Sequence, residues 1–281
     1  MGAMDGAPGQ MSNLQLRIVS AVILAAAVLT VTWLGGLPFR LLSVAMAGAI
    51  FYEWCAISRT AGTRRHQAIA AILLAMVLVA LLAEYSALMV LGLLAASVAA
   101  CALDGLVRGK GGWTAVGLAY AGLSGVSLAL LRGDDTTGLI AVLFLFAIVW
   151  ATDILAYFVG RAVGGPKLAP SISPGKTWSG ALGGAVGGML AGIVLAALAG
   201  SANLVALALV AVLLSIVSQV GDLFESSVKR RNGVKDSGSL IPGHGGVMDR
   251  VDGLVAAAFA LYVIGWLLGG ADNPAQGLFA I

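Results

Sequence analysis

Nine of the 31 Lys, Arg, Asp, Glu and His residues of this 281-residue chain lie between Ser226 and Asp252, beside several glycines. The members that could contact a phosphate or a metal are Ser226, Lys229, Arg230, Lys235, Asp236, His244, Gly245, Gly246, Asp249, Arg250 and Asp252. Cationic side chains neutralise phosphate oxygens, and carboxylates bind hard divalent cations that themselves accept phosphate ligands. Glycines let backbone amides approach an anion closely. The pattern indicates metal-dependent chemistry on a phosphate group.

Asp222 precedes this stretch at the end of an apolar run. If the helix formed by that run continues past Gly221, then Asp222, Ser226 and Lys229 share one face at i, i+4 and i+7. A Mg²⁺ held between Asp222 and Asp249, brought together from two helix ends, is the metal site that we expect. Zinc is not expected, because no cysteine accompanies His244.

A second group of polar residues lies upstream and comprises Ser173, Lys176 and Thr177. Pro174 ends regular structure there, and the ammonium group with the two hydroxyls could hold a polyphosphate. Simpler roles remain open for some of these candidates. Asp252 could cap a helix, the basic run could only set topology, and an intramembrane Glu53 could be hydrogen-bonded between helices for structure.

The rest of the chain is apolar, with 60% hydrophobic and 10% charged residues. A soluble domain carries roughly 25% charged residues, so the composition is that of a membrane protein. Crossing about 30 Å of hydrocarbon takes about 20 apolar residues. The sequence predicts an all-α, polytopic fold with about nine spans, at 16–34, 38–57, 67–83, 86–103, 114–131, 138–160, 179–199, 203–221 and 253–269.

The basic residues predict the orientation of these spans. With nine spans, only Arg40 and Arg132 fall on one side, and the other fourteen of the sixteen Lys and Arg residues fall on the opposite side. The positive-inside rule makes the crowded side cytoplasmic, with the N-terminus on that side. Long loops at 161–178 and 222–252 then face the cytoplasm.

The chain divides by charge into two regions. Residues 1–10 are interpreted as an added leader before a start at Met11, and 11–137 as the N-terminal transmembrane helices. Residues 138–281 form the C-terminal catalytic region, because both long charged loops lie there. No nucleic-acid partner is expected.

The motifs together resemble the phosphatidate cytidylyltransferases, also called CDP-diacylglycerol synthases. The spacing of Ser226-x-Val-Lys-Arg through His244-Gly-Gly-Val-x-Asp249-Arg-Val-Asp252 is similar to that family's signature throughout. The Asp153-x3-Tyr-x2-Gly-Arg161 and Ser173-Pro-x-Lys-Thr-Trp178 stretches resemble its two upstream blocks. Gly175 departs from the pattern, where the family often has a second basic residue. The resemblance is weak between about 58 and 140.

This resemblance implies transfer of the cytidylyl group of CTP to phosphatidic acid, giving CDP-diacylglycerol and pyrophosphate. It implies Mg²⁺ on Asp222 and Asp249, a monovalent cation such as K⁺ as a candidate second ion, and a homodimer. The expected location is a bacterial-type cytoplasmic (inner) membrane, with the active site facing the cytoplasm. The phosphate ligands implied are Lys176 and the charged 222–252 loop, with His244 orienting a phosphate or the loop.

Other functions stay open from the sequence. A CTP-dependent lipid-alcohol kinase would use similar groups but attack the γ-phosphorus, and a CDP-archaeol-type synthase would differ only in its lipid chains. A transporter would more often place paired charges or broken helices at mid-membrane, with an inverted repeat. A structural membrane scaffold has no use for the residues at 226–252.

Overall fold

The computed structural model describes residues 13–58, 63–241 and 245–279, with side chains from Ser20 onward. Its helices are α1 (Asn13–Leu34), α2 (Gly36–Ile57), α3 (Arg64–Leu82), α4 (Ala87–Val107), α5 (Trp113–Arg132), α6 (Thr136–Val163), α7 (Trp178–Leu198), α8 (Leu204–Arg231), α9 (Met248–Gly269) and the short α10 (Pro274–Phe279). Each predicted span coincides with one of the helices α1 to α9. The all-α, polytopic prediction is therefore confirmed.

Eight of these helices, α2 to α9, are long and apolar enough to cross a membrane, with mean hydropathy between 1.3 and 2.5. The described apolar part of α1, Ser20–Leu34, is shorter than the others. Large apolar side chains remain exposed along the helices, including Ile72 at 63% and Leu182 at 65%. Such faces suit a lipid solvent, in which apolar side chains need no cover. The protein is a multi-pass membrane protein.

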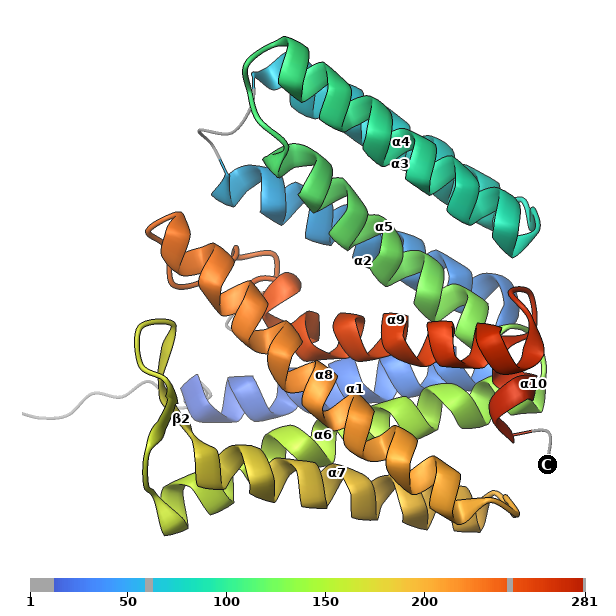
Figure 1. Cartoon of the computed structure of the whole chain (residues 1–281), viewed down its shortest axis with the longest axis vertical. Helices are drawn as coiled ribbons and strands as arrows, with labels where there is room; N and C mark the ends of the chain where they lie inside the picture. Colours follow the sequence, from blue (N-terminus) through green and yellow to red (C-terminus); the bar gives the residue numbers. More distant parts are fainter. Residues whose placement is uncertain (1–12, 59–62, 242–244, 280–281) are drawn as a thin grey trace, which may run out of the picture.

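Two helix pairs illustrate how the bundle is built (Figure 1). The α3–α4 pair packs on α2 and α5 at one edge, and α6 packs closely along α7 at the other. Glycines on α7 permit that close approach, because a Cβ at Gly184 would lie 2.8 Å from the carbonyl oxygen of Thr152 and one at Gly180 would lie 2.7 Å from that of Ala156. Small residues on α7 thus let these two helices approach closely.

The 161–178 segment contains a two-stranded antiparallel hairpin whose second strand runs through Pro174, so the expectation that Pro174 ends regular structure there is wrong. Strand β1 (Lys167–Ala169) pairs with β2 (Ser173–Thr177), with Lys167 opposite Thr177. The hairpin follows α6 directly and leads into α7, so it lies at the same end of the bundle as the C-terminus of α8 (Figure 1). We call this end, which also holds the N-terminus of α9, the hairpin end.

The opposite end of the bundle holds Arg40 and Arg132, the two cations that the topology prediction separated from the rest. Arg40 forms ion pairs with Glu84 at 2.5 Å and with Asp134 at 3.3 Å. The buried Arg132 donates to the carbonyl oxygens of Thr32 and Trp33 at the end of α1. These contacts tie together the helix ends that face away from the hairpin.

Candidate active site at the hairpin end

Helix α8 continues past Gly221 to Arg231, which fulfils the condition for Asp222, Ser226 and Lys229 to share one face. Asp222 and Ser226 lie one turn apart on it, and the Ser226 hydroxyl donates to Asp222 Oδ1 at 3.3 Å. Lys229 follows on the same face and approaches Glu225 and Asp249. The predicted face with an acid, a hydroxyl and a cation is thus present at the hairpin end.

The β-hairpin brings Lys176 to Asp222. The ammonium group of Lys176 donates a very short hydrogen bond to Asp222 Oδ2. Both side chains keep a little over a quarter of their surface exposed, at 28% and 29%. A half-open ion pair can exchange its partners for a substrate or an ion, because solvent and ligands can still reach it.

Asp249, at the first turn of α9, is held more tightly. Its carboxylate accepts hydrogen bonds from Lys229 Nζ at 2.8 Å and from the backbone N–H groups of Ser237 and Gly246, each at 2.9 Å to Oδ2. Its side chain is 9% exposed. Asp249 therefore holds Ser237 and Gly246, the two described ends of the turn before α9, against α8 as well as presenting a carboxylate.

Glu225 adds a second acid to Lys229. Lys229 Nζ lies 2.6 Å from Glu225 Oε2, and the Glu225 side chain is 1% exposed. Within the described part of the chain neither oxygen of Glu225 has a partner of hydrogen-bond geometry, so the contact is an ion pair without good alignment. Lys229 is thus shared between two buried carboxylates.

Glu53 of α2 supports the described ends of this turn, at Ser237 and at the start of α9. It is 1% exposed and accepts hydrogen bonds from Ser237 Oγ at 3.1 Å and from the backbone N–H groups of Val247 and Met248, both at 2.8 Å. The free N–H groups of the first turn of α9 are satisfied in this way, with a negative charge at the positive end of the helix. The structural interpretation of Glu53 is confirmed.

The remaining candidates divide between tethering and exposed positions. Arg230 donates to the carbonyl oxygens of Ile172 at 3.4 Å and Val234 at 3.2 Å, which ties the hairpin to the loop after α8. Thr177 caps α7 by accepting from Gly180 N, and it approaches the hydroxyl of Ser179. These contacts hold the hairpin, the loop after α8 and the start of α7 in place around the site.

The other predicted site residues lie around this centre. Lys235 and Asp236 are exposed on the loop, and Ser173 pairs with Ala169 in the hairpin. Gly245 forms an isolated bridge with Ile241 and has a φ of 87°, which favours glycine. Asp252 accepts from the N–H of Gly253, and Arg250 lies in the first turn of α9. His244 and the leader at 1–10 lie outside the described residues.

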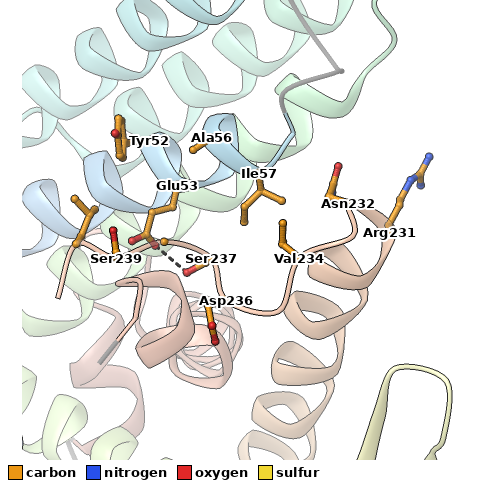
Figure 2. A pocket seen from close by; sticks show the side chains of 12 residues that line it. Tyr52, Glu53, Ala56, Ile57, Arg231, Asn232, Val234, Asp236, Ser237 and Ser239 are labelled. Atoms are coloured by element: carbon orange, nitrogen blue, oxygen red, sulfur yellow. Dashed lines mark hydrogen bonds between the residues drawn. The ribbon is translucent and has the colours of Figure 1, made fainter. Parts of the chain in front are cut away.

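A cavity of about 710 Å³ lies between the end of α2 and the 231–240 loop (Figure 2). Tyr52 and Glu53 line one side, and Arg231, Asn232 and Ser239 line the other. Figure 2 shows Glu53 and Ser237 pointing toward each other across its floor. Asp222 and Lys176 are not among its lining residues, so this cavity is separate from the ion pairs described above.

The carboxylate oxygens at the hairpin end are ligands of the kind that hard divalent cations prefer. Asp252 and Asp153 carboxylates lie within electrostatic range of Asp222. Across the described ranges, no group of three or more His, Cys, Asp or Glu side chains is arranged to hold a metal ion. Asp222 and Asp249 each contact a different lysine, and the Mg²⁺ that they are expected to share stays a prediction.

Comparison with known proteins agrees with this site. Residues 15–268 match the sequence model of the Cytidylyltransferase family. The chain is 49% identical over 272 residues to a phosphatidate cytidylyltransferase from Brucella suis, covering 96% of this chain and all of the relative. It is 50% identical to one from Brucella abortus over 91% of this chain and 94% of the relative. It is 31% identical to one from Bacillus subtilis, over 90% and 98% of the two chains.

The match covers the strand and helices that carry both lysine–aspartate pairs, and the relatives are aligned over nearly their full length. An integral-membrane fold, a cluster of cations and carboxylates at one end of the bundle and this similarity all indicate one class of enzyme. The chain belongs to the cytidylyltransferase family, among the phosphatidate cytidylyltransferases, and is a nucleotidyltransferase.

Proposed function

We propose that this enzyme transfers the cytidylyl group of CTP to phosphatidic acid, producing CDP-diacylglycerol and pyrophosphate for phospholipid synthesis. The observation that carries the proposal is the pair of lysine–aspartate contacts, Lys176 with Asp222 and Lys229 with Asp249, at one end of a membrane-spanning bundle. Such a position can receive a water-soluble nucleotide and a membrane lipid at once. The relatives from Brucella suis and Bacillus subtilis are phosphatidate cytidylyltransferases, which supports the same substrates here.

The chemistry needs charge neutralisation more than it needs an enzyme nucleophile. A phosphate oxygen of the lipid attacks the α-phosphorus of CTP, the bond to the bridging oxygen of the β-phosphate breaks, and pyrophosphate leaves. Two anions must approach for this to happen, so cationic groups lower the barrier. Lys176, Lys229, Arg230, Lys235 and Arg250 are the proposed phosphate ligands. His244 is proposed to orient a phosphate or the loop, because no general base is required.

Asp222 and Asp249 are the proposed Mg²⁺ ligands, with a K⁺ ion as a further candidate. A bound divalent ion would supply Lewis-acid neutralisation of phosphate oxygens. Both carboxylates are paired with lysine ammonium groups in this structure. If a divalent ion bound the carboxylates, the ammonium groups would become available to the phosphates. Asp222 is the better-suited ligand of the two, because it is more exposed and accepts fewer hydrogen bonds than Asp249.

The proposed setting is the cytoplasmic (inner) membrane of a bacterium, with the hairpin end facing the cytoplasm. The excess of Lys and Arg at that end supports this orientation, and CTP is a cytosolic nucleotide. Homodimerisation stays an expectation that follows from the family alone.

Position-specific labelling of CTP tests the reaction. Purified enzyme in detergent is incubated with phosphatidic acid and Mg²⁺, using CTP labelled at the α- or at the γ-phosphorus in parallel. We expect the α-label in the lipid product and the γ-label in pyrophosphate. Transfer of the γ-label to a lipid would instead identify a lipid kinase. Parallel reactions with diacyl and dialkyl (archaeol-type) phosphate lipids establish the chain type.

A further inference from the structure

Tyr120, in the middle of α5, has a fixed ring and an unused hydroxyl. Its ring centroid lies 5.7 Å from that of Trp54 and 5.8 Å from that of Phe224, so aromatic packing on α2 and α8 sets its orientation. The hydroxyl oxygen is shielded from solvent and has no hydrogen-bond partner among the described residues. Buried polar groups are nearly always paired, and one that is not calls for a functional reason.

The same ring lines an apolar groove of about 320 Å³ between α5, α8 and α9. Tyr120 and Phe224 line it nearer the hairpin end, and Val217 and Phe259 line the part farther from that end. The seven residues from Phe224 to Val217 correspond to about 10 Å along a helix. The groove therefore extends from near the charged end of the bundle into its apolar part.

The upper end of this groove adjoins the candidate active site. Gly221, which lines the groove, is followed directly by Asp222. The carboxylates of Asp252, Glu225 and Asp222 lie within electrostatic range of the Tyr120 hydroxyl. A lysine at this position would form ion pairs with those carboxylates, whereas a neutral hydroxyl can donate to a ligand oxygen.

We propose that Tyr120 is a positioning residue for the lipid substrate. Its hydroxyl donates a hydrogen bond to an oxygen of the glycerol-phosphate headgroup, while an acyl chain of the same lipid lies in the groove below. Nearly all of the lining is apolar, which matches an acyl chain and excludes a nucleotide as the occupant. The inference rests on the proposed function, since it names how that reaction's lipid is held.

The test compares Tyr120→Phe with Ser127→Ala in the purified enzyme. Both substitutions remove a buried hydroxyl without a partner from α5, but Ser127 does not line the groove. Tyr120→Phe keeps the ring packing and should raise KM for phosphatidic acid about tenfold, the usual effect of losing a hydrogen bond to a charged acceptor. KM for CTP should not change. Ser127→Ala should leave both constants at the wild-type values.

Thermal stability separates positioning from a structural role. Removing an unsatisfied buried hydroxyl should leave the melting temperature of Tyr120→Phe unchanged or raise it. A KM for phosphatidic acid equal to the wild-type value would overturn the proposal. So would a lower melting temperature with equal losses toward both substrates, because that result would indicate a packing defect.

A second variant tests the groove by itself. Val220 lines it and is 58% exposed, so Val220→Trp adds bulk there at little packing cost. We expect a higher KM for long-chain phosphatidic acid and an unchanged KM for the dihexanoyl lipid. Equal effects on both lipids would contradict an acyl chain in the groove. A wild-type enzyme that does not label phosphatidic acid from CTP would instead refute the proposed function. The wild-type assay therefore distinguishes failure of the proposed function from failure of the groove proposal.

Discussion

Glu53→Gln should weaken the turn that presents Asp249 to the active site. The buried carboxylate of Glu53 accepts one hydrogen bond from Ser237 and two from the backbone N–H groups that begin α9. A glutamine keeps one acceptor oxygen and replaces the other with an NH₂ group that cannot accept. At least one buried donor would then lack a partner, and the negative charge at the helix N-terminus would be lost.

The size of the effect follows from these two losses. An unsatisfied buried donor costs about 1–3 kcal/mol, and loss of a favourable charge at a helix terminus costs about 0.3–2 kcal/mol. Together they predict a loss of about 2–4 kcal/mol in the free energy of unfolding. Ser237 and the start of α9 would lose the support of Glu53, so cytidylyl transfer should also decrease.

Thermal unfolding in detergent measures this prediction, with Glu84→Gln as the matched control. Glu84 is 65% exposed and pairs with Arg40 at the opposite end of the bundle. Exposed ion pairs contribute roughly 0–1 kcal/mol, so the control should melt close to wild type. If Glu53→Gln melted no earlier than Glu84→Gln, the assignment of Glu53 as the support of this turn would be refuted.

Two further substitutions probe the same turn. Lys229→Met should destabilise the protein by about 3–5 kcal/mol, because it leaves the carboxylates of Glu225 and Asp249 without a counter-charge; the exposed Lys235→Met should not, and equal melting of the two variants would argue against this pairing. Gly246→Ala should lower both melting temperature and activity, since its Cβ would lie 2.7 Å from both Glu53 carboxylate oxygens. Gly175→Ala, which has open space around its Cβ, is the control. Equal melting temperatures of Gly246→Ala and Gly175→Ala would contradict the close contact at Gly246.

The helices were predictable from the sequence because each span needs its own apolar run. An apolar length of about 20 residues per span was sufficient to locate the helices, of which eight in the described part of the chain are long and apolar enough to cross a membrane. The extension of α8 past Gly221 also followed from local sequence, because Asp222, Ser226 and Lys229 recur at helical spacing. The structure adds the Ser226–Asp222 hydrogen bond that this spacing allows.

The contacts that assemble the site were not predictable, because they join distant parts of the chain. Glu53 and Val247 are separated by 194 positions. Nothing in the sequence near Glu53 indicates that its carboxylate accepts hydrogen bonds from the N–H groups at the start of α9. Lys176 reaches Asp222 only because the unpredicted hairpin pairs Lys167 with Thr177. The sequence identified the charged residues but not which lysine would neutralise which aspartate.

Tyr120 illustrates a further limit of sequence reasoning. It lies between residues 58 and 140, where the resemblance to the family is weak, and a tyrosine in an apolar span is common. Its unpartnered hydroxyl becomes evident only when α5 is packed against α8 and α9. A missing contact cannot be read from local sequence.

The most direct measurement is the transfer of label from α-labelled CTP to phosphatidic acid by the wild-type enzyme and by Asp222→Asn, with Mg²⁺ and after its removal by a chelator. Asp134→Asn, at the opposite end of the bundle and 66% exposed, is the control. The proposed function predicts Mg²⁺-dependent labelling of the lipid by the wild type and the control, and a loss of at least about 100-fold in Asp222→Asn. Lipid labelling that survives the chelator, or an Asp222→Asn enzyme that matches the control, would contradict it.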